Sequence, residues 1–306
     1  MTDAIISDGS SPIEPALVPG HGGPVQGAPG RSAAAMFFRN KPAVFGLLLL
    51  TLIILMTLFG PLLYPEDPSD IIARPFEGPG SERAPPLGTD YLGRDVLAGI
   101  VNGGGTSLKV ALIAAAIIVT IGVTIGSLAG FYGGRIDSAL MRFTEFFQVL
   151  PALLFAMVVV TLFEPSSTTI AIAIGLVLWP QLARLTRAEF LRLKNLEFVK
   201  SAQAIGSSDL RIMFRVMFPN ALPPLIVSTT LIMGAAILFE AGLAFLGLGD
   251  PNEVTWGLMV GLNRQNFLVA WWAVTFPGLA IFLTVLSFSL IGDGLQDAFN
   301  PKLRGR

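Results

Sequence analysis

The sequence lacks the side chains on which several kinds of protein chemistry depend. Its 306 residues include no cysteine and a single histidine, His21. Without cysteine the chain has no disulfide, no thiolate metal site and no cysteine nucleophile. The histidine lies in a segment rich in glycine and proline, apart from the apolar runs. These absences argue against imidazole catalysis and against an intramembrane protease or metalloenzyme.

Charged residues are also scarce. They make up 13% of the chain, against 53% hydrophobic residues and a mean hydropathy of +0.69, whereas soluble domains carry about 25% charged residues. So little polar surface does not cover a soluble globule of this size, and we expect the excess apolar surface to lie in a lipid bilayer. The net charge of −1 argues against a nucleic-acid partner.

The first 35 residues differ in composition from the rest. Glycine and proline fill 11 of the first 30 positions, without apolar periodicity. Such a segment cannot bury enough apolar area to offset the entropy of ordering it, so residues 1–35 are predicted to form a disordered tail. The apolar run that follows, 43–64, is too long for a signal peptide. At 1.5 Å per residue it measures about 32 Å, enough to cross the hydrocarbon core.

Six apolar runs predict an all-α, polytopic membrane protein with six transmembrane helices. In the second run, Gly122, Gly126 and Gly130 recur at every fourth position, which favours close helix packing. The fourth run is short, and Pro180 is expected to break or kink its end. The runs are 43–64, 107–132, 146–163, 168–183, 221–248 and 271–291.

The basic residues predict the orientation of these helices. With the N-terminus in the cytoplasm, 15 of the 20 Lys and Arg residues lie on the cytoplasmic side and five outside. This is the bias that the positive-inside rule requires, so an even number of spans places both termini in the cytoplasm. The five outside are Arg74, Arg83, Arg94, Lys109 and Arg264.

The longer of the two connecting segments, 65–106, is predicted to be external and is rich in acidic residues. Within it, Asp90 and Asp95 stand near Arg94 and suit a short capped helix on the outer face. Contact with an external protein is the alternative interpretation of these residues.

The second connecting segment, 184–220, is predicted to be cytoplasmic and to contain two short helices. Apolar residues recur there at helical spacing up to a Gly-Ser-Ser break. Gly206 suits a helix C-terminus with a positive φ, and Ser208 with Asp209 suits the start of a second helix that ends at Phe218. The residues alone leave open whether this pair lies on the membrane surface or docks a soluble partner.

This cytoplasmic segment resembles the EAA loop of ABC-importer permeases. The match lies in residues 200–219, with the spacing from Gly206 to Pro219 that the loop has. Two residues depart from the pattern: Lys200 replaces its Glu, and Ser201 replaces its first Ala. The lysine removes any salt bridge made by that Glu but leaves the backbone geometry set by Gly206.

Further motifs extend the resemblance over residues 36–306. The chain is similar to the C-type permeases of the dipeptide/oligopeptide/nickel importer family, and this similarity implies the type I ABC-importer permease fold. The matching segments are 37–42, 60–62, 86–95, 130–137, 240–249, 276–280 and 292–297.

The resemblance implies a complex in the bacterial plasma (inner) membrane. A homologous permease forms the translocation path with this chain, two ATP-binding subunits bind ATP and Mg²⁺, and an extracytoplasmic substrate-binding protein delivers the substrate. The chain itself then has no cofactor, metal or catalytic residue, and it contains no Gly-x-x-x-x-Gly-Lys-Ser/Thr loop for nucleotide phosphates. The residues implied in coupling to the ATP-binding subunits are Lys200, Ser201, Ala202, Ala204, Gly206, Asp209, Arg211 and Pro219.

The implied cargo is a di- or oligopeptide, with a nickel chelate or glutathione as alternatives within the same kind of complex. A secondary transporter that needs no ATP is the alternative of a different class. Transporters and channels of that kind often show internal repeats with broken helices or rings of intramembrane charge, and neither pattern is evident here.

Glu240 is an ionisable residue inside the fifth apolar run. Such a residue is by default a candidate for function, here as part of a gate or of the translocation path. The alternative is that Glu240 has left the hydrocarbon and caps an external helix that starts at Ala241.

The predicted organisation therefore has five parts. They are a tail at 1–35, an N-terminal region with the first transmembrane helix at 36–64, an external segment at 65–106, a permease core at 107–300 that includes the coupling loop 184–220, and a cytoplasmic tail at 301–306.

Overall fold

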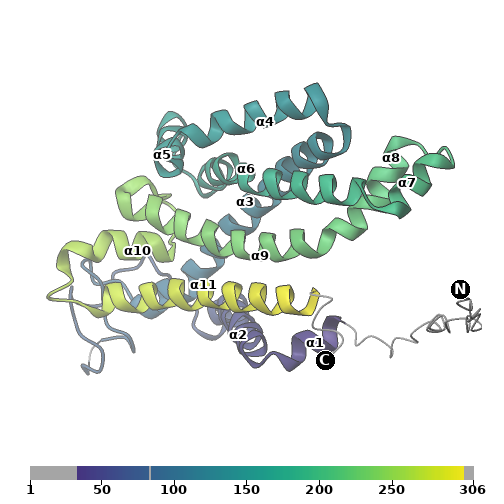
Figure 1. The fold of residues 1–306 in the computed structure, drawn as a ribbon. Coiled ribbons are helices and arrows are strands. Elements are labelled where there is room, and N and C mark those ends of the chain that lie inside the picture. Colours follow the sequence, from purple (N-terminus) through teal and green to yellow (C-terminus); the bar gives the residue numbers. More distant parts are fainter. Residues whose placement is uncertain (1–32, 83, 300–306) are drawn as a thin grey trace, which may run out of the picture.

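The computed structural model describes residues 33–82 and 84–299 (Figure 1). Over these residues the chain is helical, and its only β pairing consists of two isolated bridges. Most of the predicted tails, 1–35 and 301–306, lies outside the described residues. Residues 33–35 are described, and they open the first helix, so the prediction of disorder is wrong there.

The helices vary widely in length. In chain order they are α1 (Ala33–Arg39), α2 (Lys41–Leu63), α3 (Val96–Tyr132), α4 (Gly134–Val149), α5 (Ala152–Leu162), α6 (Ser167–Lys194), α7 (Glu197–Ala204), α8 (Asp209–Arg211), η1 (Ile212–Met217), α9 (Phe218–Leu243), η2 (Ala244–Leu248), α10 (Trp256–Asn263), η3 (Arg264–Asn266) and α11 (Trp272–Phe299).

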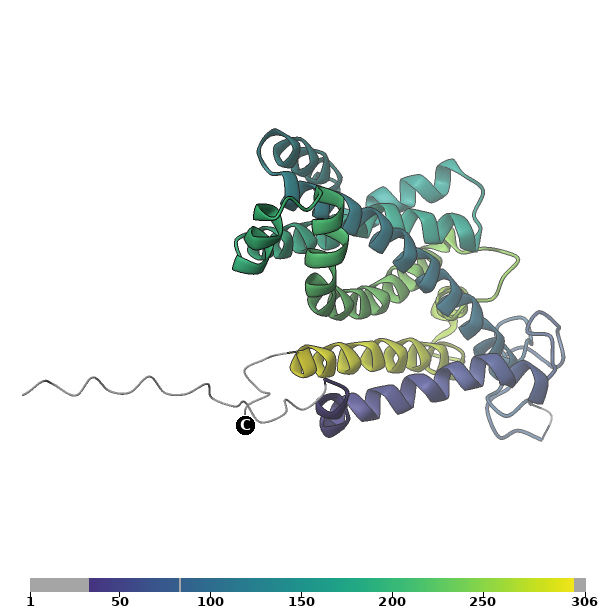
Figure 2. The same ribbon diagram turned by 90° about the vertical axis from the view of Figure 1, so that its right-hand side faces the viewer.

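Long helices packed side by side make up most of the molecule. α11 lies between α2 and α9, as both views show (Figures 1 and 2). α3 runs obliquely to them and packs along α6. The main core cluster joins α3, α5, α6, α9 and α11, with Trp179, Ile174 and Ile237 among its fully buried side chains.

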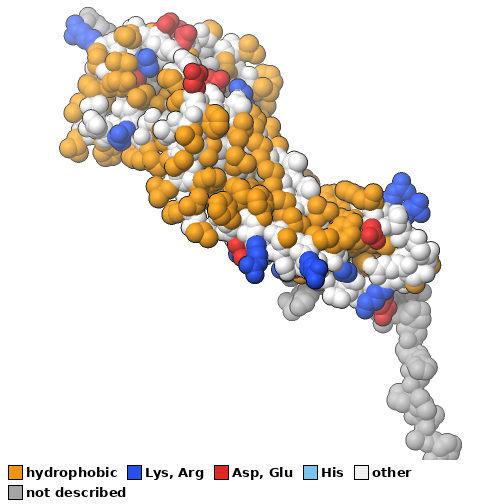
Figure 3. All heavy atoms as spheres, turned by 90° about the horizontal axis from the view of Figure 1, so that it is seen from above, with side chains coloured by type: hydrophobic (Ala, Val, Ile, Leu, Met, Phe, Trp, Pro, Cys, Tyr) orange, Lys and Arg blue, Asp and Glu red, His pale blue; other side chains and the backbone are white. Residues whose placement is uncertain are grey.

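Five helices are long and apolar enough to cross a membrane, and a sixth span exists if the bent pair α4 and α5 is counted as one. The five are Lys41–Leu63, Val96–Tyr132, Ser167–Lys194, Asp209–Leu248 and Trp272–Phe299. Hydrophobic side chains form a broad band over the face drawn in Figure 3, and most charged side chains on that face lie toward its two ends. This is the distribution that a membrane-spanning chain requires.

The third predicted span is not a single straight helix. α4 and α5 meet at an angle of 84°, and α5 alone has 11 residues, about 16 Å. Pro151 explains the break, because a proline disfavours helical geometry in the residue before it, and Leu150 is extended at φ −79° and ψ 134°. The predicted run 146–163 therefore crosses this bend.

Two other prolines do not interrupt helices as predicted. α6 continues through Pro180 to Lys194, among neighbouring helices that make such residues tolerable in spans. The helix predicted to end at Phe218 instead runs on through Pro219 into α9. Before Pro219 the chain makes a π-helical turn, in which the Phe218 N–H donates to the Met213 carbonyl, and this wider turn leaves room for the proline ring.

The predicted external segment 65–106 is shorter in the structure. α3 begins at Val96, and Asp95 caps it by accepting hydrogen bonds from Leu97 N (2.7 Å) and Ala98 N (3.3 Å). Asp95 therefore starts a membrane-spanning helix, and the short outer-face helix predicted around Arg94 is absent from the described segment.

The glycines of α3 allow a close contact with α6. A Cβ on Gly122 would lie 3.0 Å from the Trp179 carbonyl oxygen, and one on Gly130 would lie 2.6 Å from the Phe190 Cβ. A Cβ on Gly126 would overlap the Ala183 carbonyl. The predicted close packing is confirmed, since α6 approaches α3 where only glycine leaves room.

Candidate functional site: a helical knob and a buried carboxyl

α7 and α8 form a compact knob, defined here as residues 197–211, at one end of α6 and α9 (Figure 1). α7 ends at Gly206, which has φ +76°. Gly206 N–H donates to the Gln203 carbonyl (3.0 Å), and Ser207 N–H donates to the Ala202 carbonyl (3.1 Å). This is the Schellman pattern that ends helices at glycine, so the predicted break and positive φ at Gly206 are confirmed.

The second half of the knob joins directly to a membrane span. Ser208 occupies the N-cap position of α8 with extended geometry, but its side chain makes no capping hydrogen bond. From Asp209 the chain stays helical to Leu246, and Gly247 then leaves helical geometry at φ +88°. The α8 half of the knob is therefore continuous with α9, and the Gly206 turn joins α7 to it.

Buried side chains fix the knob to the body of the molecule. Val199 of α7 and Ile212, Met213 and Met217 of η1 are buried and belong to the main core cluster. The knob is thus rigidly attached, because its inner face is part of the same core as α3 and α6.

The residues implied in coupling lie mostly on the outer surface of the knob. Ala202 is the exception, since it is half-buried and packs on the core cluster. Lys200 is exposed, and within the described part of the chain its ammonium group makes no ion pair. The exposed members of the set are Lys200, Ser201, Ala204, Gly206, Asp209, Arg211 and Pro219.

Large exposed apolar side chains on the knob and on the η1 turn that follows it were not predicted from the sequence. Ile205 is 83% exposed, Leu210 64% and Phe214 63%. They flank the Gly206 turn on both sides. Large apolar residues on both sides of a predicted glycine turn were the signal available in the sequence. Side chains that stay exposed at such a turn add nothing to the core, so a contact with a partner is the alternative explanation for them.

Glu240 lies inside α9, three residues before its end, and is 1% exposed. Its Oε2 accepts a hydrogen bond from Ser107 Oγ of α3 (3.3 Å). Ser107 Oγ in turn accepts a hydrogen bond from Trp256 N of α10 (3.3 Å). Its Oε1 has no partner within the described residues. Because no helix begins at Ala241, the cap interpretation is wrong.

Glu240 therefore sits where three helices meet, at the end of α9 opposite the knob. Trp256 strengthens this junction by donating from Nε1 to the Ile100 carbonyl (2.9 Å). A Cβ on Gly257 of α10 would lie 2.5 Å from the Ala241 Cα. α10 thus lies directly against the helical turn that carries the carboxyl.

The segment between η2 and α10 is tied to two spans by acidic side chains. Asp250 Oδ2 accepts from Ser167 N at the start of α6 (3.0 Å), and Glu253 Oε2 accepts from Ser167 Oγ (2.8 Å). Glu253 also pairs with Lys109 of α3 at 3.5 Å. Both charges are partly exposed, so this pair adds little stability.

Two family models match the sequence. The model described as "Binding-protein-dependent transport system inner membrane component" matches residues 122–305. The model described as "N-terminal TM domain of oligopeptide transport permease C" matches residues 28–86.

Similar proteins include the di/tripeptide transport system permease protein DppC of Pseudomonas aeruginosa (strain UCBPP-PA14), 40% identical over 88% of this chain and 90% of the relative. The dipeptide transport system permease protein DppC of Escherichia coli (strain K12) is also 40% identical, over 88% of this chain and 91% of the relative. Among solved structures, an inward-facing MetNI methionine ABC transporter matches with a TM-score of 0.52 and 15% identity, over 65% of this chain and 96% of that chain. At 15% sequence identity this structural similarity supports the fold alone.

Proposed function

Because this chain belongs to the family of inner-membrane components of binding-protein-dependent transport systems, we propose that it is the permease subunit of an ATP-driven importer of di- or oligopeptides. In this proposal it forms the translocation path with a homologous permease chain. Two separate ATP-binding subunits hydrolyse ATP, and an extracytoplasmic binding protein delivers the peptide.

The observation that carries the proposal is the construction of the knob. It presents exposed apolar side chains beside a rigid Gly206 turn, and it continues without interruption into a membrane-spanning helix. An exposed apolar patch of this kind suits a protein partner. A partner that pushes the knob therefore moves α9 directly, as coupling of ATP hydrolysis to the spans requires.

The peptide cargo is supported by the names of the relatives, which are di- and tripeptide transport permeases at about 40% identity. The proposed location is the bacterial inner membrane with both termini in the cytoplasm, supported by the distribution of basic residues. A tag after Arg306 should then resist external labelling in intact cells, and a tag near Glu77 should be labelled.

The test is reconstitution of the chain with its permease, ATP-binding and binding-protein partners in proteoliposomes. Uptake of a labelled dipeptide should require ATP hydrolysis and continue when the proton gradient is dissipated. Uptake that persists without ATP would identify a secondary transporter. If excess glutathione or a nickel chelate inhibits the uptake and excess unlabelled peptide does not, the proposed peptide cargo is wrong.

The docking role of the knob has a matched pair of variants. Leu210→Asp places a charge beside the Gly206 turn, where Leu210 is 64% exposed, and Leu268→Asp places one at a more open site beyond η3, where Leu268 is 96% exposed. Leu210→Asp should lose copurification of the ATP-binding subunits, whereas Leu268→Asp should retain it. Equal copurification in both variants would contradict docking at the knob.

A further inference from the structure

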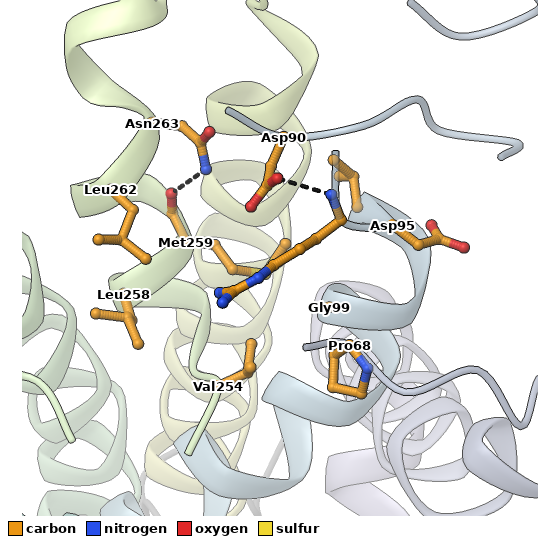
Figure 4. A pocket seen from close by; sticks show the side chains of 11 residues that line it. Pro68, Asp90, Asp95, Gly99, Val254, Leu258, Met259, Leu262 and Asn263 are labelled. Atoms are coloured by element: carbon orange, nitrogen blue, oxygen red, sulfur yellow. Dashed lines mark hydrogen bonds between the residues drawn. The ribbon is translucent and has the colours of Figure 1, made fainter. Parts of the chain in front are cut away.

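Arg94 lines a small pocket beside α10, at the end of the molecule opposite the knob (Figure 1). Figure 4 shows the residues that line this pocket. The pocket has a volume of about 40 Å³, room for about three water-sized groups. Its walls come from three elements: the segment before α3 provides Pro68, Asp90 and Asp95 beside Arg94, α3 provides Val96 and Gly99, and α10 with the residues before it provides the rest. That remaining wall is mostly apolar and consists of Val254, Leu258, Met259, Leu262 and Asn263.

The guanidinium group of Arg94 has no acidic partner. None of the ion pairs among the described residues includes it, and its Nε is buried without a hydrogen-bond acceptor. A buried donor left without an acceptor is costly. Because Nε is shielded and Arg94 as a whole is only half-buried, the terminal nitrogens of the guanidinium are the donors that a group entering the pocket can reach.

The two nearby carboxylates accept hydrogen bonds from groups other than the Arg94 side chain. Asp90 Oδ1 accepts from Leu92 N (2.8 Å) and from the main-chain N of Arg94 (2.9 Å), the second of which is drawn in Figure 4. Asp95 Oδ1 caps α3, and its Oδ2 accepts from the Tyr64 hydroxyl (2.5 Å). These bonds hold the backbone around Arg94 and leave its side chain to an external acceptor.

The frame of the pocket is rigid. Asn263 Oδ1 accepts from Tyr91 N (3.2 Å), and its Nδ2 donates to the Met259 carbonyl (2.9 Å), so α10 is fastened to the turn that carries Arg94. Gly93 beside it has φ +89°, where a Cβ would overlap the Ala73 carbonyl. A site held in this way loses little entropy when a ligand enters.

We propose that this pocket receives a carboxylate side chain of the extracytoplasmic binding protein, bound by the guanidinium of Arg94. Arginine presents paired donors that match a carboxylate, and the apolar wall suits the methylene groups of a Glu or Asp stem. The pocket has room for one carboxylate group but not for a peptide. The occupant is therefore a side chain of the binding protein and not the transported peptide. This inference rests on the proposed function, which places this end of the molecule outside.

The test uses the reconstituted complex in nanodiscs and measures its affinity for the purified binding protein. Arg94→Gln should weaken that affinity about ten- to hundredfold, as loss of a charge-assisted hydrogen bond implies, and Arg94→Lys should lie between. Arg74→Gln is the matched control, since Arg74 is exposed in the same segment and does not line the pocket. The affinity of the unchanged complex should fall with added salt more steeply than that of Arg94→Gln.

A second measurement identifies the occupant without relying on loss of binding. A photoreactive benzoylphenylalanine at Leu262, which lines the pocket and is half-exposed, should crosslink to the binding protein. Crosslinking to the partner permease instead, or equal affinities for Arg94→Gln and Arg74→Gln, would overturn the inference. The proposed function is tested separately, by ATP-dependent dipeptide uptake in the unchanged complex. If that uptake occurs, the proposed function stands whatever the Arg94 variants show, and if it fails, the proposed function is wrong.

Discussion

Replacing Gly206 tests how far the shape of the knob determines coupling. Gly206 has φ +76°, and no heavy atom lies within 4 Å of a Cβ built on it. A substitution there therefore meets no neighbour, and its entire cost comes from the backbone. An L-residue in this left-handed region costs roughly 1–2 kcal/mol, and Asn less than Ala because its side chain tolerates the region. A β-branched residue such as Val costs more than Ala.

The strain has only local ways to relax. The Schellman bonds made by Gly206 and Ser207 hold the end of α7, while Val199 and Met217 are buried in the core. We expect the turn to lose these two bonds and α7 to change direction against α8. A knob that must fit a groove of its partner then fits less well, so coupling should fall in the order Gly, Asn, Ala, Val.

The assay compares binding-protein-stimulated ATP hydrolysis and peptide uptake at equal membrane levels of each variant. Gly278→Ala is the control, because Gly278 also has open space around its Cβ position but no positive φ. It should insert and transport as the unchanged protein does. Wild-type transport by Gly206→Val, with the complex intact, would show that residues 200–219 are not the coupling element.

The remaining predictions concern the membrane-embedded part. Glu240→Gln keeps the shape of the side chain and the bond to Ser107 Oγ, so the complex should assemble. If the carboxyl belongs to the gate or the translocation path, peptide uptake should change. Normal uptake would contradict that hypothesis. Gly126→Ala places a Cβ 2.6 Å from the Thr186 Cβ and should destabilise the fold by about 1–3 kcal/mol, measured as the loss in thermal stability of the purified chain. Gly105→Ala, in open space on the same helix, should cost nothing, and equal stability of the two variants would contradict the close α3–α6 packing.

The features that could be predicted from the sequence are those governed by short-range physics. Length and hydropathy locate α2, α6 and α11, because the bilayer sets how many apolar residues a span needs. The end of α7 at Gly206 is predictable since only glycine adopts φ +76° at no cost. The spacing of Gly122, Gly126 and Gly130 likewise predicts where another helix can approach.

The effects of proline were not predictable in the same way. Pro151 breaks a helix pair, whereas Pro180 and Pro219 lie within continuous helix. A proline removes one hydrogen bond and crowds the preceding turn, but neighbouring helices and wider turns decide whether the helix survives. Those neighbours come from distant parts of the chain, so the local sequence does not contain the answer.

The contacts of Glu240 depend on tertiary structure in the same sense. Its partner Ser107 belongs to α3 and in turn accepts a hydrogen bond from Trp256 N of α10, and these residues lie far apart in the chain. The sequence places the residue within a span, and only the packing of α10 against α9 shows that it is buried rather than at the outer surface. The unpaired guanidinium of Arg94 is hidden for a related reason, since Asp90 and Asp95 look like its partners in sequence but bond to backbone amides instead.

The helix that runs from Asp209 to Leu246 connects these features mechanically. At 1.5 Å per residue, the stretch from Asp209 in the knob to Glu240 at the junction extends about 48 Å. π-helical turns lie at both ends, in η1 and η2, and Gly247 in η2 has φ +88°. Because π turns weaken the regular hydrogen-bond ladder, bending is easiest at these ends, and the middle of α9 moves as one body. A displacement of the knob therefore reaches α10 and the Arg94 pocket through packed helix rather than through loops.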